Sequence, residues 1–276
     1  MRSRTKKIAR IIIFIGLIVL SALMLAPFAW MISSSLKTDL EVFIFPVQWI
    51  PANPQWQNYV NIWALIPLST FFRNTVILTV VITSFALLTS SFAAYGFSRI
   101  QWRGRDTVFL AYIGTIAVPW QAFMVPQFIL MRHFGLVDTL WAMILIQSFS
   151  ALGVFLMRQF YLTIPEELSE AARIDGMSEY GIYARIILPL TKPAIATLVI
   201  LIGTFVWNDF MGPLIYLSSM RNMTVQIGIR MFIGLHSSLY SYIMAASVLA
   251  ILPLALLFFS AQKYFIEGIA ATGIKS

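Results

Sequence analysis

The sequence contains no cysteine and few charged residues, and each shortage excludes a class of protein. Without cysteine, the chain can form neither a disulfide nor a thiolate metal site. Charged residues make up 11% of its 276 positions, against about 25% in a typical soluble domain. The two histidines, His133 and His236, fall in predicted loops and have no partners at metal-ligand spacing. We therefore expect neither a metal centre nor an ordinary soluble domain.

A nucleotide-binding motif is also missing. The pattern G-x-x-x-x-G-K-[ST], which binds phosphates in many ATPases, does not occur. We therefore expect that the chain is not an enzyme and holds no cofactor of its own. The net charge of +8 is compatible with nucleic-acid binding. In so apolar a chain it instead indicates membrane orientation, because Lys and Arg collect on the cytoplasmic side, and we predict no nucleic-acid partner.

Long apolar runs dominate what is present. Hydrophobic residues make up 59% of the chain, and its mean hydropathy is +0.84. We predict an all-α membrane protein forming a single domain, 1–276, because six runs reach the roughly 20 residues that cross a bilayer. The predicted spans are 8–32, 71–97, 107–131, 138–160, 194–217 and 242–264. The first run is too long for the apolar core of a signal peptide, so we expect it to remain as a span.

The distribution of basic residues predicts the orientation of these spans. With both termini on the cytoplasmic side, fourteen Lys and Arg residues lie in inner segments and five in outer segments. This bias is the one found in proteins of the cytoplasmic membrane. The longest inner segment, 161–193, contains five of the chain's eleven acidic residues. It is too polar for the bilayer interior and must lie in water or against a partner.

The inner segment 161–193 has the signals of a helix–turn–helix. Thr163 and Glu166 have the spacing of a capping box, and Pro165 suits a first helical turn. Gly176 can end the first helix by adopting a positive φ angle. A second, shorter helix would follow, capped by Ser178 and ended by Pro189.

One face of the predicted first helix has the character of a docking surface. Leu168, Ala171, Ala172 and Asp175 are three or four residues apart and share this face. Its small alanines allow another backbone to approach closely, and Glu170 beside it can accept a charge-assisted hydrogen bond. A solvated loop helix, with Glu170 paired to Arg173, explains the same residues and stays open as an alternative.

Residues EAARIDG, 170–176, followed by Ile186, Leu188 and Pro189, resemble the EAA loop of ABC importer permeases. Five further stretches resemble carbohydrate permeases of the maltose type: PFAWMISSSLK at 27–37, Asn58-Tyr59, AAYGFSR at 93–99, WND at 207–209 and the terminal GIAATGIK. The six spans and short first outer loop are similar to the smaller of the two permeases in such systems. Met177 departs from the pattern, which more often has a small residue there.

This resemblance implies a set of partners and coupling residues. The EAA loop would dock on a cytoplasmic ATPase, and its characteristic positions are Glu170, Ala171, Ala172, Asp175, Gly176, Leu188 and Pro189. A second homologous permease, two ATPase copies that bind ATP and magnesium, and an extracytoplasmic sugar-binding protein would complete a prokaryotic importer. The tail at 265–276 would also contact the ATPases.

The function implied is import of a sugar, a di- or oligosaccharide, by alternating access. Pathway candidates in the fifth span are Trp207, Asn208, Asp209 and Phe210, where Pro213 would break the helix; Gln121 and Gln147 are weaker candidates. A structural polar contact explains the WND residues equally well.

Three alternatives remain at this point. The chain could be an ABC permease for glycerol-3-phosphate or a similar polyol, since such permeases share the pattern. It could be an ion-coupled secondary transporter with Asp209 as a proton relay, or a membrane scaffold or receptor subunit. The secondary transporter leaves the EAA loop unexplained, and a scaffold or receptor would be supported by a sizeable extramembrane signalling domain, which the sequence does not predict. The sequence does not say which sugar would be carried.

Overall fold

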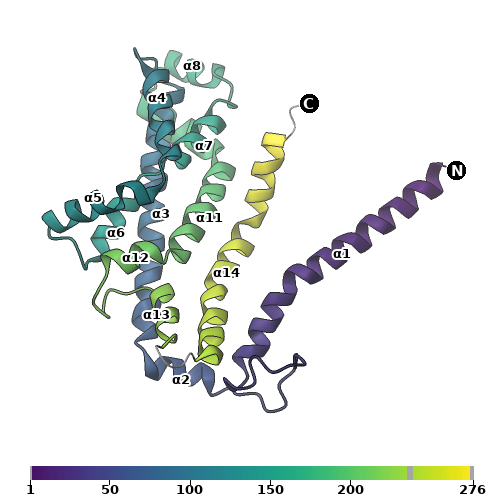
Figure 1. The fold of residues 1–276 in the computed structure, drawn as a ribbon. Coiled ribbons are helices and arrows are strands. Elements are labelled where there is room, and N and C mark those ends of the chain that lie inside the picture. Colours follow the sequence, from purple (N-terminus) through teal and green to yellow (C-terminus); the bar gives the residue numbers. More distant parts are fainter. Residues whose placement is uncertain (1, 235–238, 274–276) are drawn as a thin grey trace. The chain divides into compact units, whose positions relative to one another are not determined.

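The structure is a computed structural model that describes residues 2–234 and 239–273, so His236 and residues 274–276 of the predicted tail lie outside it. Within those ranges the ordered elements are helices (Figure 1). The chain divides into two compact units. The first comprises Met1–Leu68 with Gly228–Leu252, and the second Ser69–Ile227 with Pro253–Ser276.

The first unit contains the amino-terminal helix α1 (Arg2–Ser35), α2 (Asn58–Leu65), the end of α13 (Val225–Met231) and the start of α14 (Tyr240–Gly273). The apolar stretch Arg10–Ser35 of α1 has none of its most hydrophobic window buried. A helix that is apolar on all sides is stable only inside a membrane or against other protein. This agrees with the predicted first span, 8–32.

Two motifs of the first unit meet at the end of α1. The Asn58 side chain donates to the backbone oxygens of Ser35 and Lys37, both at 2.9 Å. The Tyr59 hydroxyl lies 2.7 Å from the hydroxyl of Ser35. Terminal carbonyls of a helix have no partner within the helix. The Asn-Tyr pair therefore caps α1 and joins it to α2.

The second unit is organised around α3 (Leu68–Ser98), which agrees with the second predicted span. The third predicted span, 107–131, is wrong as a single helix. It consists of α4 (Arg105–Gly114), a 3-10 turn (Thr115–Ala117) and α5 (Trp120–His133), with a bend of 97°. The cause is Pro119, which lacks an N–H group and holds the residue before it, Val118, in an extended conformation (ψ 114°). His133 is the last residue of α5, and not a loop residue as predicted.

The fourth and fifth predicted spans are also interrupted. Helices α6 (Leu140–Gln147) and α7 (Ala151–Tyr161) meet at 41°, and the Ser150 hydroxyl caps α7 by accepting from the N–H of Gly153 at 3.0 Å. Helix α11 (Lys192–Asn208) ends before Asp209, and α12 is Met211–Tyr216. The prediction that Pro213 breaks this helix is wrong. Pro213 is the third residue of α12, where its missing N–H costs little.

The number of spans depends on how these bends are counted. By length and composition the described residues contain three uninterrupted candidate spans, or up to six if each bent pair is one span. The pair assigned to the fifth span joins Glu179–Leu190 to Lys192–Asn208 at 76°. The sixth predicted span, 242–264, lies within α14, whose apolar part is Tyr240–Ser260. That helix continues through the predicted tail as far as Gly273.

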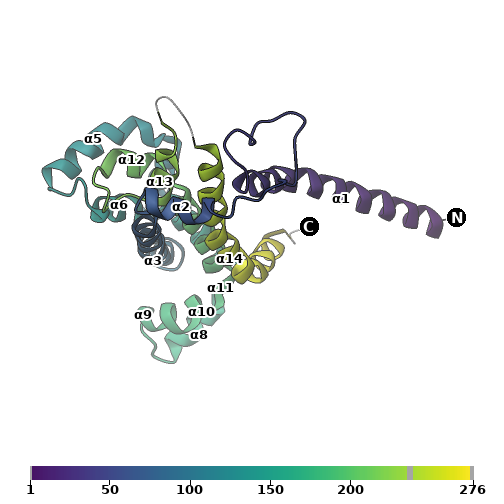
Figure 2. The same cartoon turned by 90° about the horizontal axis from the view of Figure 1, so that it is seen from below.

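Two buried clusters hold the second unit together. One joins the end of α3 to α4, α7, the segment 161–193 and the start of α11, with Met157 and Ile187 fully buried. The other joins the middle of α3 to α5, α6 and α12, with Ile82 fully buried and Met143 nearly so. Figure 2, which views α3 nearly end-on, shows α8–α10 on one side of it and α5, α6 and α12 on the other. Each cluster supports one candidate site.

Candidate functional site

The segment 161–193 forms the predicted helix–turn–helix, and two of the residues predicted to end or cap its helices do so. Its first helix, α8, is Glu167–Ile174, and Gly176 follows with φ +81°. The second, α9, is Glu179–Ile182, and the Ser178 hydroxyl caps it by accepting from the N–H of Gly181 at 3.3 Å. Left-handed backbone favours glycine, and a serine cap contributes about 1 kcal/mol. These local signals are therefore confirmed.

Three other local predictions for this segment are wrong. The Thr163 hydroxyl donates to the Phe160 carbonyl and caps nothing, and Pro165 precedes α8 rather than lying in its first turn. Pro189 does not end the second helix. The chain continues through a π-helical turn, Tyr183–Ile187, into α10 (Leu188–Leu190). The wider turn leaves room for the Pro189 ring, which in an α-helix would clash with the carbonyl four residues back.

The two sides of α8 differ. Ser169 and Ala172 are buried against the chain's own cluster, so Ala172 does not share the open face predicted for it. Leu168 is 45% and Ile174 86% exposed, and Ala171 and Asp175 are exposed as well. The exposed side of α8 therefore presents small and apolar side chains next to charged ones.

Glu170 is also exposed, and its carboxylate has no hydrogen bond or ion pair to the described residues. Arg173, offered above as its alternative partner, instead donates to Glu179 at 2.6 Å. That bond raises the pKa of the Arg173 guanidinium above its ordinary value, so Arg173 stays charged. The carboxylate of Glu170 is thus available to a partner.

A buried polar network fixes this segment to α3. The Tyr95 hydroxyl donates to the carboxylate of Glu179 at 2.7 Å. Ser91 lies 2.7 Å from the hydroxyl of Tyr161 and 2.8 Å from that of Tyr183. At the end of α3, one nitrogen of the Arg99 guanidinium donates to two backbone carbonyls, those of Tyr161 and Ile164. These bonds join the residues on both sides of α8 to α3, although the Nε atom of Arg99 and the hydroxyl of Ser169, in α8 itself, are buried without a hydrogen-bond partner among the described residues.

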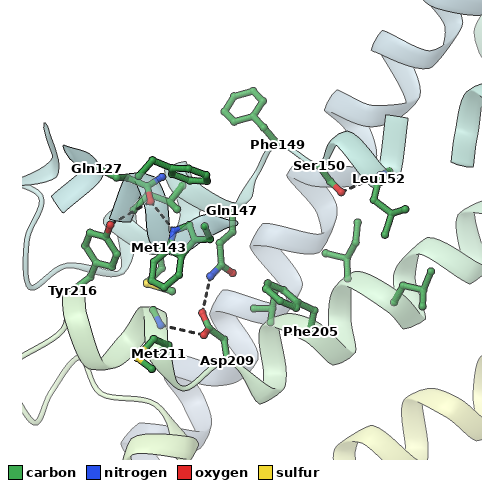
Figure 3. A pocket seen from close by; sticks show the side chains of 18 of the residues that line it. Gln127, Met143, Gln147, Phe149, Ser150, Leu152, Phe205, Asp209, Met211 and Tyr216 are labelled. Carbon is green, nitrogen blue, oxygen red and sulfur yellow. Dashed lines mark hydrogen bonds between the residues drawn. The ribbon is translucent and has the colours of Figure 1, made fainter. Parts of the chain in front are cut away.

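The second site is a cavity of about 670 Å³ between α5, α6, α7, α11 and α12 (Figure 3). Its walls are mostly apolar and aromatic, and its polar side chains include Gln121, Gln127, Gln147 and Asp209. Small-molecule sites typically have roughly 300–1,000 Å³ and this kind of lining. The geometry is therefore that of a ligand cavity.

Asp209 stands in the break between α11 and α12 and joins the cavity's helices. One carboxylate oxygen accepts from the side-chain nitrogen of Gln147 at 2.6 Å, and the other from the N–H of Gly212 at 3.1 Å (Figure 3). A Cβ atom at Gly212 would lie 2.5 Å from an oxygen of Asp209. The close approach of the carboxylate to the backbone therefore requires glycine at this position.

Gln127 is oriented by two donors. Its oxygen accepts from the indole N–H of Trp120 at 2.9 Å and from the Tyr216 hydroxyl at 3.3 Å. Gln147 is only partly satisfied, because its oxygen is buried and has no hydrogen-bond partner among the described residues. The cavity therefore contains both an ordered amide and an unpaired acceptor.

The structure brings together three of the six predicted pathway residues. Gln121, Gln147 and Asp209 line the cavity, whereas Trp207, Asn208 and Phe210 do not. Trp207 is buried, with its ring 6.3 Å from that of Phe72. Asn208 bonds to the Thr204 carbonyl and to Gln226. The structural contact weighed above for the WND residues thus describes Trp207 and Asn208, while the role of each in a pathway stays a prediction.

Sequence reasoning missed Trp120, Gln127 and Phe205 of the cavity wall. A signal existed for two of them. Trp120 and Gln127 lie in the same predicted span as Gln121, and each has a polar group. Polar groups inside a span need a hydrogen-bond partner or a cavity. Phe205 gave no signal, since phenylalanine is ordinary in a membrane helix.

A clasp outside the helices supports one wall of this cavity. Asp138, in the connection before α6, accepts from the N–H groups of Ser218 and Ser219 at 2.9 Å each and from the hydroxyl of Ser219. Its own N–H donates to the carbonyl of Tyr216 at 2.8 Å. The bonds from Ser219 and Ser218 hold the pKa of Asp138 well below its ordinary value. This clasp fixes the end of α12.

The chain is similar to known transport proteins along its whole length. Residues 86–270 match the family described as binding-protein-dependent transport system inner membrane component. The chain is 34% identical to the arabinooligosaccharides transport system permease protein AraQ of Halalkalibacterium halodurans, over 100% of both. It is 33% identical to the melibiose/raffinose/stachyose import permease protein MelC of Bacillus subtilis, again over 100% of both.

A solved structure shares the fold. A chain from a bacterial ABC transporter involved in the import of the acidic polysaccharide alginate superposes with a TM-score of 0.83, at 24% identity. The superposition covers 95% of this chain and 98% of that one.

Proposed function

The chain belongs to the family of inner membrane components of binding-protein-dependent transport systems, and we propose that it is a permease subunit that imports an oligosaccharide across a bacterial cytoplasmic membrane. The names of its relatives support a sugar as cargo: two are permeases for arabino-oligosaccharides and for melibiose, raffinose and stachyose. Both names refer to the transport of oligosaccharides.

The observation that carries the coupling role is the structure of α8. Its exposed face, with Leu168, Ala171 and Ile174, is apolar, and Glu170 beside it has no partner within the described chain. The opposite side packs on the chain's own core through Ala172, and the residues before and after α8 are bonded to α3 by Arg99 and by the Tyr95–Glu179 bond. A surface that is rigidly held and unoccupied can receive a force from a docked partner and pass it to the membrane helices.

We place that face on a cytoplasmic ATPase, with both termini on the same side, in keeping with the excess of basic residues in the inner segments. A second permease, two ATPases that bind ATP and magnesium, and an extracytoplasmic sugar-binding protein complete the assembly. Asp175, Gly176, Leu188 and Pro189 shape the docking segment, Ala172 packs it onto its own chain, and the end of α14 lies on the same side.

The mechanism we propose is alternating access between two states. Closure of the ATPase pair on ATP draws the α8 segments of the two permeases together, and the network at α3 transmits this motion to the spans. The binding protein then delivers sugar to the outward-facing pathway, and hydrolysis restores the inward-facing state. Such a cycle requires that ATP binding favours one of the two conformations.

The charge of Glu170 gives the sharpest test. In proteoliposomes containing the whole importer, Glu170→Arg should abolish sugar uptake and release the ATPase on purification, while the amount of permease in the membrane is unchanged. Glu170→Asp, which keeps the charge at the same position, is the matched control and should retain both. Normal uptake by Glu170→Arg would contradict the assignment.

The same proteoliposomes separate the alternatives. A secondary transporter with Asp209 as its proton relay would lose uptake when a protonophore is added with ATP held constant. An ATP-driven permease should keep its uptake under that condition. Uptake of labelled glycerol-3-phosphate in place of oligosaccharide would identify the polyol alternative.

A further inference from the structure

We propose that the cavity between α5, α6, α7, α11 and α12 is a binding subsite for a neutral oligosaccharide within this chain, and that the carboxylate of Asp209 excludes acidic sugars and phosphate esters from it. The inference rests on the proposed importer function and names its substrate class. The cavity lies wholly within the second unit, so the site is built by this one chain.

The charge of the lining gives the first argument. Of the residues that line the cavity, Asp209 is the only ionisable acid, and none is Lys, Arg or His. Proteins recognise carboxylates and phosphates mainly with Arg and Lys, through charge-assisted hydrogen bonds. An acidic sugar would find no such cation here and would meet a like charge in a poorly screened site. A neutral sugar meets neither obstacle.

The amides give the second argument. The Gln147 oxygen is buried without a hydrogen-bond partner among the described residues, while its nitrogen is committed to Asp209. The Gln127 oxygen is already occupied by Trp120 and Tyr216, which leaves its amide nitrogen as a donor. A sugar hydroxyl is both donor and acceptor. It can therefore accept from the Gln127 nitrogen, and it can reach the buried Gln147 oxygen once that side chain turns toward the cavity; a lipid acyl chain can do neither.

The aromatic walls give the third argument. The indole N–H of Trp120 is used within the protein, so its ring face remains as apolar surface in the cavity. Phe149 and Phe205 are 67% and 66% exposed and line the same cavity. Aromatic faces are electron-rich and attract the C–H faces of sugar rings. Flat apolar walls beside a few amides suit a neutral sugar.

The absence of native cysteine allows a direct test of occupancy. Met211→Cys places one thiol in the cavity wall, where Met211 is 49% exposed. In the complete importer, its rate of maleimide labelling is measured with arabinotriose or raffinose as neutral probes and an alginate trisaccharide as the acidic probe. Thr204→Cys, an exposed position of α11 that does not line the cavity, is the control.

The neutral probe that the importer carries should slow labelling of Met211→Cys about fivefold or more at concentrations well above its dissociation constant. It should leave Thr204→Cys unchanged. The acidic probe should have no effect until Asp209→Asn is added, which removes the charge and keeps the shape. Asp209→Asn should also improve uptake of the acidic probe relative to the neutral one about tenfold, as expected on removing one like charge from a partly screened site.

Three results would overturn the subsite. The first is equal protection by the acidic probe while Asp209 is unmodified, and the second is no protection by a neutral sugar that the same vesicles import. The third is a Met211→Cys thiol that never reacts, which would mean that another chain fills the cavity. Failure of the proposed function looks different. In that case the vesicles import no probe and their ATPase is not stimulated by any binding protein, and this inference falls with it.

Discussion

The two candidate sites differ in what surrounds their unpaired polar groups. In the segment 161–193, Tyr95, Glu179 and Arg173 are bonded to one another, and Arg99 satisfies two backbone carbonyls. The Ser169 hydroxyl and the Nε atom of Arg99 are buried there without a partner among the described residues, but neither residue lines the ligand-sized cavity; the unpaired oxygen of the other site belongs to Gln147, which does. Paired groups stabilise a fold, whereas an unpaired buried group costs about 1–3 kcal/mol.

This difference separates a connecting element from a binding element. The segment 161–193 needs a rigid inner side so that its exposed face can transmit force. The cavity needs groups that the protein itself leaves unsatisfied, so that a ligand can satisfy them. Substitutions in the first region should therefore lower both stability and transport, and substitutions in the second should lower transport alone.

The largest effect is expected for Arg99→Ala. Arg99 is 6% exposed and donates to the carbonyls of Tyr161 and Ile164. Its loss removes both bonds; the Tyr161 carbonyl keeps the N–H of Ile164, and the Ile164 carbonyl loses its donor, at a cost of roughly 1–3 kcal/mol. The thermal midpoint of the purified importer and its uptake rate should both fall. Arg103→Ala, at an exposed position nearby, should change neither. Equal midpoints for the two variants would remove the basis of the comparison.

Gln147→Leu tests the other side of the comparison. It removes an unpaired acceptor together with a donor to Asp209, so the two effects on stability partly cancel. We expect a thermal midpoint close to that of the unmodified protein and a KM for sugar raised about tenfold, or about 1.4 kcal/mol. Gln226→Leu, outside the cavity, should keep the original KM. A fall in midpoint as large as that of Arg99→Ala would show that Gln147 is structural.

A smaller effect should sharpen the account of the connecting network. Tyr95→Phe and Glu179→Gln each weaken one hydrogen bond, and a double-mutant cycle should give a coupling energy of about 0.5–1.5 kcal/mol. Tyr180→Phe combined with Glu179→Gln is the control, because Tyr180 is 70% exposed, and its coupling should be near zero. Equal coupling in both cycles would mean that Tyr95 contributes nothing specific.

The smallest effect concerns pH and the clasp at Asp138. Bonds from Ser219 and Ser218 lower the pKa of Asp138 below its ordinary 3.8. A lowered pKa contributes stability that is fully present above the unfolded value and is lost as pH falls through the folded value. The difference in thermal midpoint between the unmodified protein and Asp138→Asn should therefore be constant from pH 8 to about 5 and shrink below about pH 4. A difference that already shrinks near pH 6 would contradict this reading.

The sequence predicted local structure where one residue type determines it. Gly176 was correctly assigned a positive φ and Ser178 a capping role, because each follows from the chemistry of that residue alone. The 97° bend at Pro119 was not predicted, because the apolar run continues through it. The apolar runs also predicted where the long helices lie, because length and hydropathy can be read from a continuous run of residues.

What the sequence could not give were relations between distant residues. Gln147 and Asp209 are 62 positions apart, and nothing local indicates that they bond. Asp209 ends α11 although the sequence signal nearby is Pro213, because the carboxylate finds its donors only in the folded chain. Ala172 was placed on the wrong face for a similar reason. The cluster that buries it includes residues of α3 and α9, which the spacing within α8 does not reveal.

The π-helical turn Tyr183–Ile187 changes the rotational phase of the helix that contains it. One residue of an α-helix corresponds to a rotation of about 100°, and a π turn accommodates one extra residue without that rotation. Ile182 and Ile187, five positions apart, are therefore both fully buried, although the spacing of an ordinary helix would separate them. Deleting a single residue here would restore regular winding and turn α9 relative to α10 by about a quarter of a revolution. The length of this turn, more than the identity of its side chains, thus sets the direction in which the preceding docking helix is presented.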